Sequence, residues 1–471
     1  MLLVKKKYGS FVGFEGAKNA NKCLPYDNVE FTNNGCTLLQ RAKYPTLVGI
    51  LETTGTRYGF TKTNNSIYLC KPLDESYPPF CVGSKIVDRL HNKLISFSFE
   101  HWNDNLPRGI FLSLLGDCGS AEAEKKACTL KASPYVWKSL PEIVEPSWER
   151  EHIFGAFTID PVGCKDADDC ICFFKDGLAI SIADVSAYVE VNPWMKHAEH
   201  IGTSLYENGT CVKPMFPACL SEDKFSLVEG KDRLAYSLFI TFKDGIIHHS
   251  WKETIVNIKS YNYESIYTSG HASLLKDYVY RLSGIQTDDS HKWVEALMLY
   301  YNTQAGEKAV ILRKQKGKNL ENAKLFEPLS ESYMYLCYES AKYCLASEES
   351  FHAQLGVEKY AHASSPIRRY VDIINQFALK GKPFEYGCIE RFNNIQNAAK
   401  TFERELIFLD LYYKQRVLEG IVLDRDNIFI PCLKKVIPYF NTHEIKTKVS
   451  IKYYTNPQSN KWKEKIIFQV E

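Results

Sequence analysis

Four aspartates lie close together after a strand-like run, in the segment T-I-D-P-V-G-C-K-D-A-D-D. Like charges this near repel one another unless solvent or a divalent cation neutralises them, and carboxylate oxygens are ligands that Mg²⁺ prefers. In a loop held by Pro161 and Gly163 they could bind one or two ions about 3.5–4 Å apart, one activating water and the other steadying the leaving oxygen of a phosphodiester. The segment therefore predicts metal-assisted hydrolysis. The candidate ligands are Asp160, Asp166, Asp168 and Asp169.

Two other interpretations of this segment are open. A run of aspartates is also typical of a solvated surface loop, so the spacing alone does not identify a metal site. A calcium loop of the EF-hand type needs a glycine at its sixth position and a glutamate at its twelfth, and the segment has neither at those spacings. Calcium sensing is therefore not expected.

A second segment, Y-A-H-A-S-S-P-I-R-R-Y, begins two hundred residues later, at residue 360. Ser365 is a favoured helix N-cap and Pro366 suits a first turn, so we expect a helix to begin there. Arg368 and Arg369 would lie beside free backbone N–H groups at the end of the helix that attracts anions, which predicts a phosphate site. The alternative is an ordinary capped helix with one buried and one solvated arginine. The expected apolar face consists of Ile367, Val371, Ile374 and Phe377.

The elements around these segments predict an α+β unit over residues 151–385. Runs typical of strands come first, and runs with apolar residues three and four apart, typical of helices, follow. A further helix, within residues 386–416, leads into a β-like region at 417–471, where residues 433–471 hold eight lysines and three glutamates. That basic stripe suits phosphate contacts or is a solvated surface. The expected strands cover 152–160, 170–174 and 178–191, and the expected helices cover 293–313, 331–346 and 388–413.

Residues 44–135 have the short alternating runs and turn residues of a small β-barrel of the OB or cold-shock type. Tyr58 and Phe60 would either offer stacking faces to bases or fill the core of the barrel. Residues 1–43 are then an N-terminal extension, and the proline-bearing stretch 136–150 is a linker.

Length and composition limit the remaining possibilities. The chain has 471 residues, a net charge of +2 and 15 cysteines without a C-x-x-C pair. We expect two to four domains, reduced thiols rather than a disulfide scaffold, and an intracellular, most simply cytoplasmic, protein. No apolar run reaches the length of a membrane span, and the first residues do not resemble a secretory signal.

Together the two segments resemble the RNB family of exoribonucleases, which includes RNase II, RNase R and the catalytic subunit associated with the eukaryotic exosome. The family motif I-D-P-x-x-x-x-D-x-D-D is matched by residues 159–169, and S-P-I-R-R-Y by residues 365–370. Blocks between them, at 182–189, 202–235 and 293–302, resemble the family's connecting blocks in the same order. The resemblance implies a central RNB domain flanked by cold-shock and S1-like β domains.

The resemblance also implies a reaction and roles for single residues. The chain would hydrolyse single-stranded RNA from its 3′ end to nucleoside 5′-monophosphates with Mg²⁺, for which Mn²⁺ could substitute. The aspartates resemble the metal ligands, with Asp168 and Asp169 at the chemical step, and Arg368 resembles the arginine that grips the scissile phosphate. Residues that resemble, or are expected to make, RNA contacts are Tyr206, Tyr263, Glu295, Arg369 and Glu403.

Some positions depart from the family pattern. The family often has histidine where this chain has Ser181 and Ala187, and usually His-Arg where it has Asn375 and Gln376. These departures affect the support of the site but remove no metal ligand. We find no endonuclease domain, so docking to an exosome is not expected, and we expect a monomer. An RNB-fold RNA-binding regulator without catalysis is the main alternative, and a magnesium-dependent DNA nuclease is a third.

Overall fold

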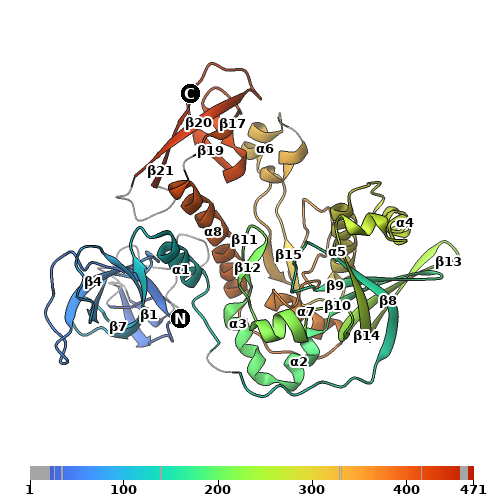
Figure 1. Ribbon diagram of the computed structural model, residues 1–471, viewed down its shortest axis with the longest axis horizontal. Helices are drawn as coiled ribbons and strands as arrows, with labels where there is room; N and C mark the ends of the chain where they lie inside the picture. Colours follow the sequence, from blue (N-terminus) through green and yellow to red (C-terminus); the bar gives the residue numbers. More distant parts are fainter. Residues whose placement is uncertain are drawn as a thin grey trace. The chain divides into compact units, whose positions relative to one another are not determined.

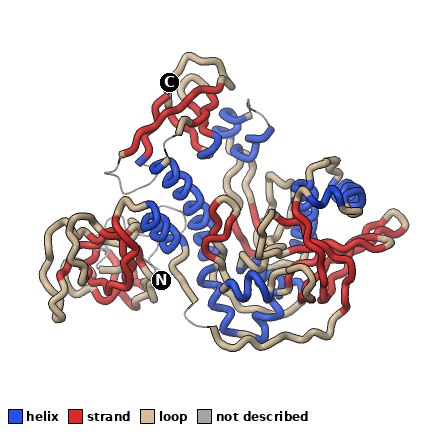
Figure 2. Tube along the Cα trace, in the orientation of Figure 1, coloured by secondary structure: helices blue, strands red, loops and turns tan. Residues whose placement is uncertain are grey.

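The computed structural model describes residues 22–25, 27–32, 35–137, 140–327, 329, 331–414, 416–456 and 465–470. The chain forms two compact units. Figures 1 and 2 show its helices and strands. The first comprises residues 1–136, 400–419 and 449–471, and the second comprises residues 137–399 and 420–448. Helices and antiparallel strands occur in both, which confirms the α+β class. Among the described residues no helix is long and apolar enough to span a membrane.

A closed barrel of five strands forms the core of the first unit. Its elements are β3 (Leu47–Leu51), β4 (Ser66–Pro72), β5 (Phe80–Ser84), β6 (Lys93–His101), β7 (Arg108–Asp117) and the helix α1 (Ala121–Ala132). The strands follow one another around the barrel in the order β3-β4-β5-β7-β6, and parallel pairing of β5 with β7 closes it. In β5, Phe80, Val82 and Ser84 are buried, because alternate side chains of a strand point to the same face. The core contains Leu51, Phe80 and Phe97.

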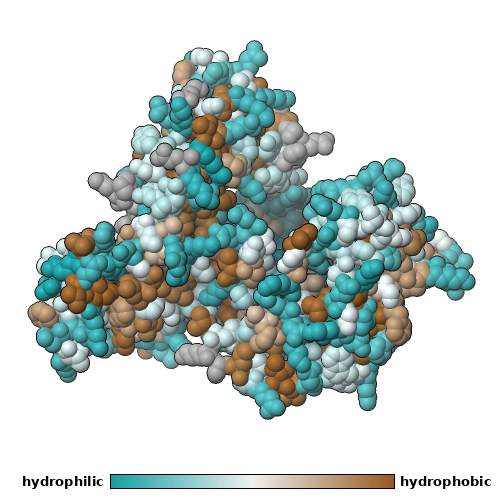
Figure 3. Space-filling model, in the orientation of Figure 1, coloured by the Kyte–Doolittle hydropathy of each residue, from teal (hydrophilic) through white to brown (hydrophobic). Residues whose placement is uncertain are grey.

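The exposure of two aromatic side chains on this barrel decides whether they fill its core. Tyr58 and Phe60 are 52% and 57% exposed, so they do not fill its core. Apolar side chains are scattered over the molecular face in Figure 3, as is usual for folded proteins. In β7, Ile110, Leu112 and Leu114 alternate along the strand and are each about half exposed. Two further strands of this part of the chain, β1 (Asn28–Thr32) and β2 (Gly35–Gln40), form an antiparallel hairpin.

A second closed barrel lies in the second unit and carries the aspartate segment. Its strands are β8 (Glu151–Asp160), β9 (Asp169–Phe174), β10 (Gly177–Ala183), β13 (Asp232–Lys243) and β14 (Ile246–Asn262), in the order β10-β13-β14-β8-β9. Every residue of β10 is buried, and Trp293 and Tyr301 pack into the same core as Leu238. Strands β8 and β14 run parallel and end together, with Asp160 opposite Asn262. The barrel therefore presents the first aspartate at a strand end.

Further helices and short strands belong to the second unit. The helices are α2 (Val185–Val191), α3 (Ala198–Ile201), α4 (Ala272–Ser283), α5 (Ser290–Gly306), α6 (Leu320–Phe326) and α7 (Tyr370–Leu379). The strands are β11 (Leu205–Glu207), β12 (Thr210–Lys213), β15 (Ile311–Lys314) and β16 (Lys342–Leu345). The long helix α8 (Ile389–Tyr413) agrees with the expectation for 388–413, and the β-like region after it contains β17 (Leu418–Val422), β18 (Asn427–Ile430), β19 (Lys435–Pro438), β20 (Lys448–Thr455) and β21 (Ile466–Val470). The predicted domain limits stay predictions.

Several predictions of secondary structure were wrong. Residues 331–346 form a 3-10 turn and then β16, which pairs with β15, rather than a helix. The predicted helix 293–313 ends at Gly306, and its last residues form β15. Residues 178–191 form β10 and then α2 rather than one strand, because the carboxylate of Asp184 accepts the Ala187 N–H and caps the helix. Short apolar runs do not distinguish strand from helix, so pairing and capping decided these cases.

Candidate active site

The aspartate segment is a loop between two neighbouring barrel strands. Asp160 is the last residue of β8 and Asp169 is the first of β9. A turn begins the loop, in which the Cys164 N–H donates to the Pro161 carbonyl (3.0 Å) and Gly163 has a φ of +82°, a conformation that favours glycine. Further along, Ala167 donates to the Ser226 hydroxyl and accepts from Leu227, both at 3.0 Å. The loop is thus fixed by hydrogen bonds, unlike a solvated run of charges.

The arginine segment reaches this loop from a different part of the chain. The Ile367 N–H donates to Oδ1 of Asp168 (2.9 Å), and Nε of Arg368 lies 3.5 Å from Oδ2 of the same carboxylate. The two partners Asp168 and Ile367 are 199 positions apart in the sequence. The fold therefore brings together the two segments on which the sequence prediction rests.

The predicted start of the helix was wrong. Helix α7 begins at Tyr370, five residues after Ser365, and Arg369 before it has an extended backbone (φ −138°, ψ 123°). Residues 365–369 form a turn, in which the Ser365 carbonyl accepts the N–H groups of Arg368 (3.3 Å) and Arg369 (3.0 Å). The backbone N–H that we expected to face a phosphate binds the protein's own Asp168. The anion-attracting role consequently lies with the Arg368 side chain, which is 42% exposed.

The second arginine of the motif has an internal partner. Nε and Nη2 of Arg369 donate to the two carboxylate oxygens of Asp372 (2.9 and 2.7 Å), and Asp372 is fully buried. Asp372 also accepts the Ser365 N–H (2.8 Å). This agrees with the alternative of one buried and one solvated arginine. The expected RNA contact of Arg369 stays a prediction, and in the structure its guanidinium stabilises the turn.

Burial and mutual repulsion raise the pKa values of three of the aspartates. Burial raises the pKa of Asp160 to about 6, with Asp166 adding to the shift, and that of Asp169 to about 7, with Asp160 adding to it. Burial also raises the pKa of Asp168 well above its ordinary value, although Arg368 and the Ile367 N–H oppose this. Because Asp160 and Asp169 repel each other, their two protons belong to the pair rather than to either residue. A cation near them would favour the ionised carboxylates and so oppose all three shifts.

The donor set fits a hard divalent cation. Asp168 is 6% exposed, and no residue that the structure describes donates a hydrogen bond to the Asp169 carboxylate. Carboxylate oxygens without protein donors, at a site of unbalanced negative charge, are the chemistry that Mg²⁺ or Mn²⁺ requires. The aspartate oxygens are spread along a loop rather than gathered at one point. Within the described residues, the set whose possible ligand atoms all lie within 4.8 Å of one another is a different one, Asp88, His91 and Asp117.

That other set lies in the first barrel and already has a cation. The Lys93 ammonium forms ion pairs with both Asp88 and Asp117, and the Lys93 side chain is only 5% exposed. Both carboxylates raise the pKa of Lys93, so it stays charged. A metal ion there would have to displace a buried ammonium. We therefore place the candidate metal site at the aspartate loop.

Tyr206 lies against the same loop. Its hydroxyl donates to Oδ2 of Asp166 (2.7 Å), and burial followed by the charge of Asp166 raises the pKa of Tyr206. The side chain comes from β11, which pairs with β12. The structure thus brings Tyr206 to a predicted metal ligand, while its expected contact with RNA stays a prediction.

The other expected RNA contacts lie in different surroundings. The ring of Tyr263 stacks on His291 at 3.6 Å between centroids, and burial together with Asp160 and Asp169 raises its pKa to about 12. Glu295, on α5 one turn after His291, is exposed and pairs with Lys292 (2.6 Å). Glu403, on α8, belongs to the first unit. The roles of these three residues stay predictions.

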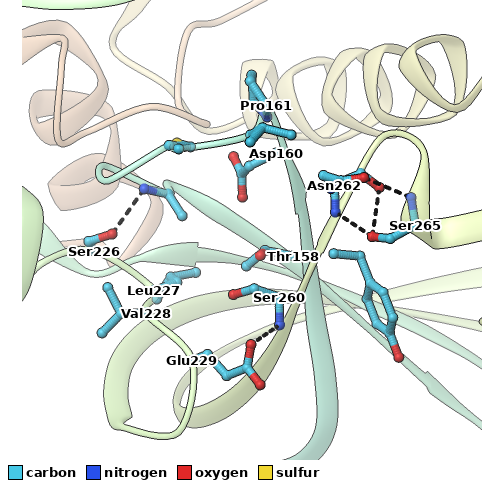
Figure 4. A pocket seen from close by; sticks show the side chains of 15 residues that line it. Thr158, Asp160, Pro161, Ser226, Leu227, Val228, Glu229, Ser260, Asn262 and Ser265 are labelled. Atoms are coloured by element: carbon cyan, nitrogen blue, oxygen red, sulfur yellow. Dashed lines mark hydrogen bonds between the residues drawn. The ribbon is translucent and has the colours of Figure 1, made fainter.

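A pocket of about 400 Å³ adjoins the loop (Figure 4). Its walls come from the aspartate loop, from residues 226–229 and from the end of β14. In Figure 4 the Asp160 carboxylate points into the space above Thr158 and Ser260. Glu229 accepts the Ser260 N–H at its far side (3.1 Å). The pocket is acidic and partly apolar, and it makes one face of Asp160 accessible.

Sequence reasoning missed the buried polar residues that hold these elements. The Asp184 carboxylate binds Nζ of Lys380 (2.6 Å) and Nη1 of Arg150 (2.7 Å). Burial alone would raise the pKa of Asp184, but these two cations outweigh it and lower that pKa. A charged residue in an apolar run, such as the aspartate of I-A-D-V-S, is a usable signal for such a site.

Two of the positions that depart from the family pattern, Asn375 and Gln376, carry neutral amides that form hydrogen bonds. Asn375 exchanges hydrogen bonds with the backbone of Ile311 and also donates to the His362 carbonyl (2.9 Å). Gln376 donates to the Ala183 carbonyl (2.8 Å) and accepts the Ser186 N–H (3.2 Å). Both amides are fully buried and satisfied. Support of the site is therefore kept with different residues.

Models of two known domain families match the chain. The model of the RNB domain family matches residues 153–268 and 284–382, and that of the Dis3-like cold-shock domain 2 matches residues 67–132. Ribonuclease R of Chlamydia muridarum is 30% identical over 185 residues, which cover 35% of this chain and 26% of that protein. Exosome complex exonuclease dis3 of Schizosaccharomyces pombe is 25% identical over 269 residues, covering 48% and 28%. The chain thus spans about a quarter of the length of these relatives.

Solved structures share the fold. The apo form of Mycoplasma genitalium RNase R superposes with a TM-score of 0.67 at 16% identity, covering 100% of this chain and 99% of that one. Yeast Ssd1, described as a pseudonuclease, gives 0.62 at 14% identity, covering 93% and 71%. At these identities the likeness shows the fold alone.

Proposed function

Because the chain belongs to the RNB family, which includes exoribonucleases, we propose that it is itself a 3′→5′ exoribonuclease. It would hydrolyse single-stranded RNA to nucleoside 5′-monophosphates with the help of Mg²⁺. The observation that supports this most is the contact of Asp168 with Ile367 and Arg368, which joins the acidic loop to a half-exposed guanidinium.

In this proposal the acidic side chains bind the metal and the arginine binds the phosphate. Asp160, Asp166, Asp168 and Asp169 would hold Mg²⁺, or Mn²⁺ in its place. Bound metal would supply a nucleophilic water at neutral pH and neutralise the leaving oxygen. Arg368 would hold the scissile phosphate, because its fixed guanidinium is exposed on one side and oriented by Asp168 and by the Ser365 hydroxyl (3.0 Å) on the other. Tyr206 and Tyr263 would contact the terminal nucleotides.

A second candidate is an RNA-binding protein of this fold without catalysis. The structural neighbour described as a pseudonuclease supports this alternative, because the fold alone does not separate the two. The residues favour the enzyme, since all the motif aspartates and Arg368 are present.

The test is digestion of 5′-labelled single-stranded RNA with Mg²⁺ by the full chain and by Asp169→Asn. A ladder that shortens from the 3′ end only with the unmodified chain supports the proposal. RNA binding without shortening by either chain would establish the non-catalytic alternative. Equal cleavage of single-stranded DNA would refute RNA specificity. Monomeric state, cytoplasmic location and absence from an exosome stay predictions.

A further inference from the structure

The hairpin β11–β12 connects the two halves of the candidate site. Its turn is tight, with Asn208 and Gly209 at φ values of 48° and 81°. At its base, Thr203 Oγ1 and the Ser204 N–H both donate to the Arg368 carbonyl at 3.0 Å. Near its start, Tyr206 reaches Asp166. One short element therefore bonds to the arginine turn and to the aspartate loop at once.

Asp166 depends on this hairpin for its position. Among the described residues its carboxylate has two hydrogen-bond donors, the Tyr206 hydroxyl at 2.7 Å and the Cys164 thiol at 3.8 Å. A thiol is a weak donor, whereas a hydroxyl bonded to a carboxylate makes a short, charge-assisted bond. Oδ2 accepts from Tyr206, and the Cys164 contact on Oδ1 is weak. Tyr206 thus orients the carboxylate through Oδ2, and Oδ1, which has only the weak Cys164 contact, stays available to a cation.

We propose that Tyr206 is a positioning residue for the metal ion, in addition to any contact it makes with RNA. Its hydroxyl fixes Asp166 so that the free oxygen points to the cation, and the loss of such an outer partner typically costs about 10–100-fold in metal affinity. This inference rests on the proposed function, since it takes Asp166 as a metal ligand. It separates two tasks of one side chain, because the ring can stack on a base while the hydroxyl serves the metal.

Tyr206→Phe tests the inference, since it removes the hydroxyl and keeps the ring. Tyr236→Phe is the control: Tyr236 is a buried tyrosine of the same unit, and its hydroxyl donates to the Leu379 carbonyl (3.0 Å) rather than to an aspartate of the loop. Isothermal titration calorimetry measures the binding of Mn²⁺ and Mg²⁺ without RNA. Fluorescence anisotropy measures RNA affinity in EDTA.

We expect Tyr206→Phe to weaken metal binding about tenfold, to raise the half-saturating Mg²⁺ concentration for RNA shortening by a similar factor, and to change RNA affinity less than twofold. Tyr236→Phe should bind metal as the unmodified chain does. Unchanged metal affinity in Tyr206→Phe would overturn the inference, as would a tenfold loss confined to RNA affinity.

A double-mutant cycle guards against a general loss of structure. In an Asp166→Asn background, Tyr206→Phe should have no further effect on metal affinity, because the pair acts together. Additive losses would overturn the inference. If the metal affinity of the chain depends on Tyr206 and Asp166 but the chain never shortens RNA, the proposed function is refuted and the inference about Tyr206 stands. If the chain shortens RNA but its metal affinity does not change in Tyr206→Phe, the inference is refuted and the proposed function stands.

Discussion

Replacing Asp169 by Asn should stabilise the metal-free protein while abolishing its activity. Burial raises the pKa of Asp169 from 3.8 to about 7, and Asp160 adds to the shift. A carboxyl group with a raised pKa in the folded state contributes stability below its unfolded pKa, and that stability is lost as the pH rises through the folded pKa. At pH 8 the ionised group therefore destabilises the fold, and asparagine removes the charge at nearly the same volume.

The size of the effect follows from the shift. A rise of about three in the pKa of Asp169 corresponds to a loss of at most about 4 kcal/mol in the free energy of unfolding at a pH above both pKa values. Asp169 keeps some contact with solvent and shares its charge repulsion with Asp160, so we reduce this by half, to about 2 kcal/mol. For a unit of this size that raises Tm by about 4–8 °C.

Differential scanning calorimetry in EDTA at pH 8 and pH 5 measures this gain. At pH 5 the carboxyl is protonated in the folded state but largely ionised in the unfolded state, whose pKa is 3.8, so the difference in Tm between the two chains should fall to about half or less of its value at pH 8. Saturating Mg²⁺ at pH 8 should raise the Tm of the unmodified chain more than that of Asp169→Asn. The control is Asp176→Asn, in the exposed turn between β9 and β10, which should leave Tm unchanged. If Asp169→Asn melts at or below the unmodified chain in EDTA at pH 8, the charge at this position is not destabilising and the reasoning fails.

Three further outcomes are expected. Mg²⁺ affinity should weaken as the pH falls below about 7, because metal binding requires ionised carboxylates and burial raises the pKa of Asp169 to about 7 and that of Asp160 to about 6. Calorimetry of Mg²⁺ binding in buffers of different ionisation enthalpy should show the release of these protons. The absence of proton release would contradict the assignment. Arg368→Lys should lower kcat for RNA shortening by about 10²-fold, because one preorganised donor is lost, while RNA affinity in EDTA stays within about tenfold; an equal loss of both would indicate a binding role only. Asp372→Asn should destabilise the fold by about 3 kcal/mol or more in urea unfolding, since it leaves the buried Arg369 without its counter-ion, and a neutral result would show that this pair does not stabilise the turn.

Sequence patterns identified the residues of the candidate site better than the residues that hold them in place. The aspartate and arginine segments were recognisable because their spacing has chemical meaning, and the structure brings the two segments together, although the Ile367 N–H that we expected to face a phosphate binds Asp168. The prediction of where α7 begins was wrong. Ser365 is of a residue type that often caps helices, but its N–H donates to Asp372 within a turn, and the helix begins at Tyr370. The bond from Tyr206 to Asp166 joins residues 40 positions apart and has no local signature. Contacts set by topology in this way are accessible only once the fold is known.

The large separation in sequence between Asp168 and its hydrogen-bond donor affects when the candidate site can form during synthesis. Its donor, the Ile367 N–H, lies 199 residues later, and at about 5–20 residues per second the ribosome needs some 10–40 s to make that stretch. Through that interval a nascent chain carries the aspartate loop without Ile367 or Arg368. If the proposed function is correct, fragments that stop before residue 367 should therefore be inert towards RNA, because they lack the docked Ile367 and Arg368.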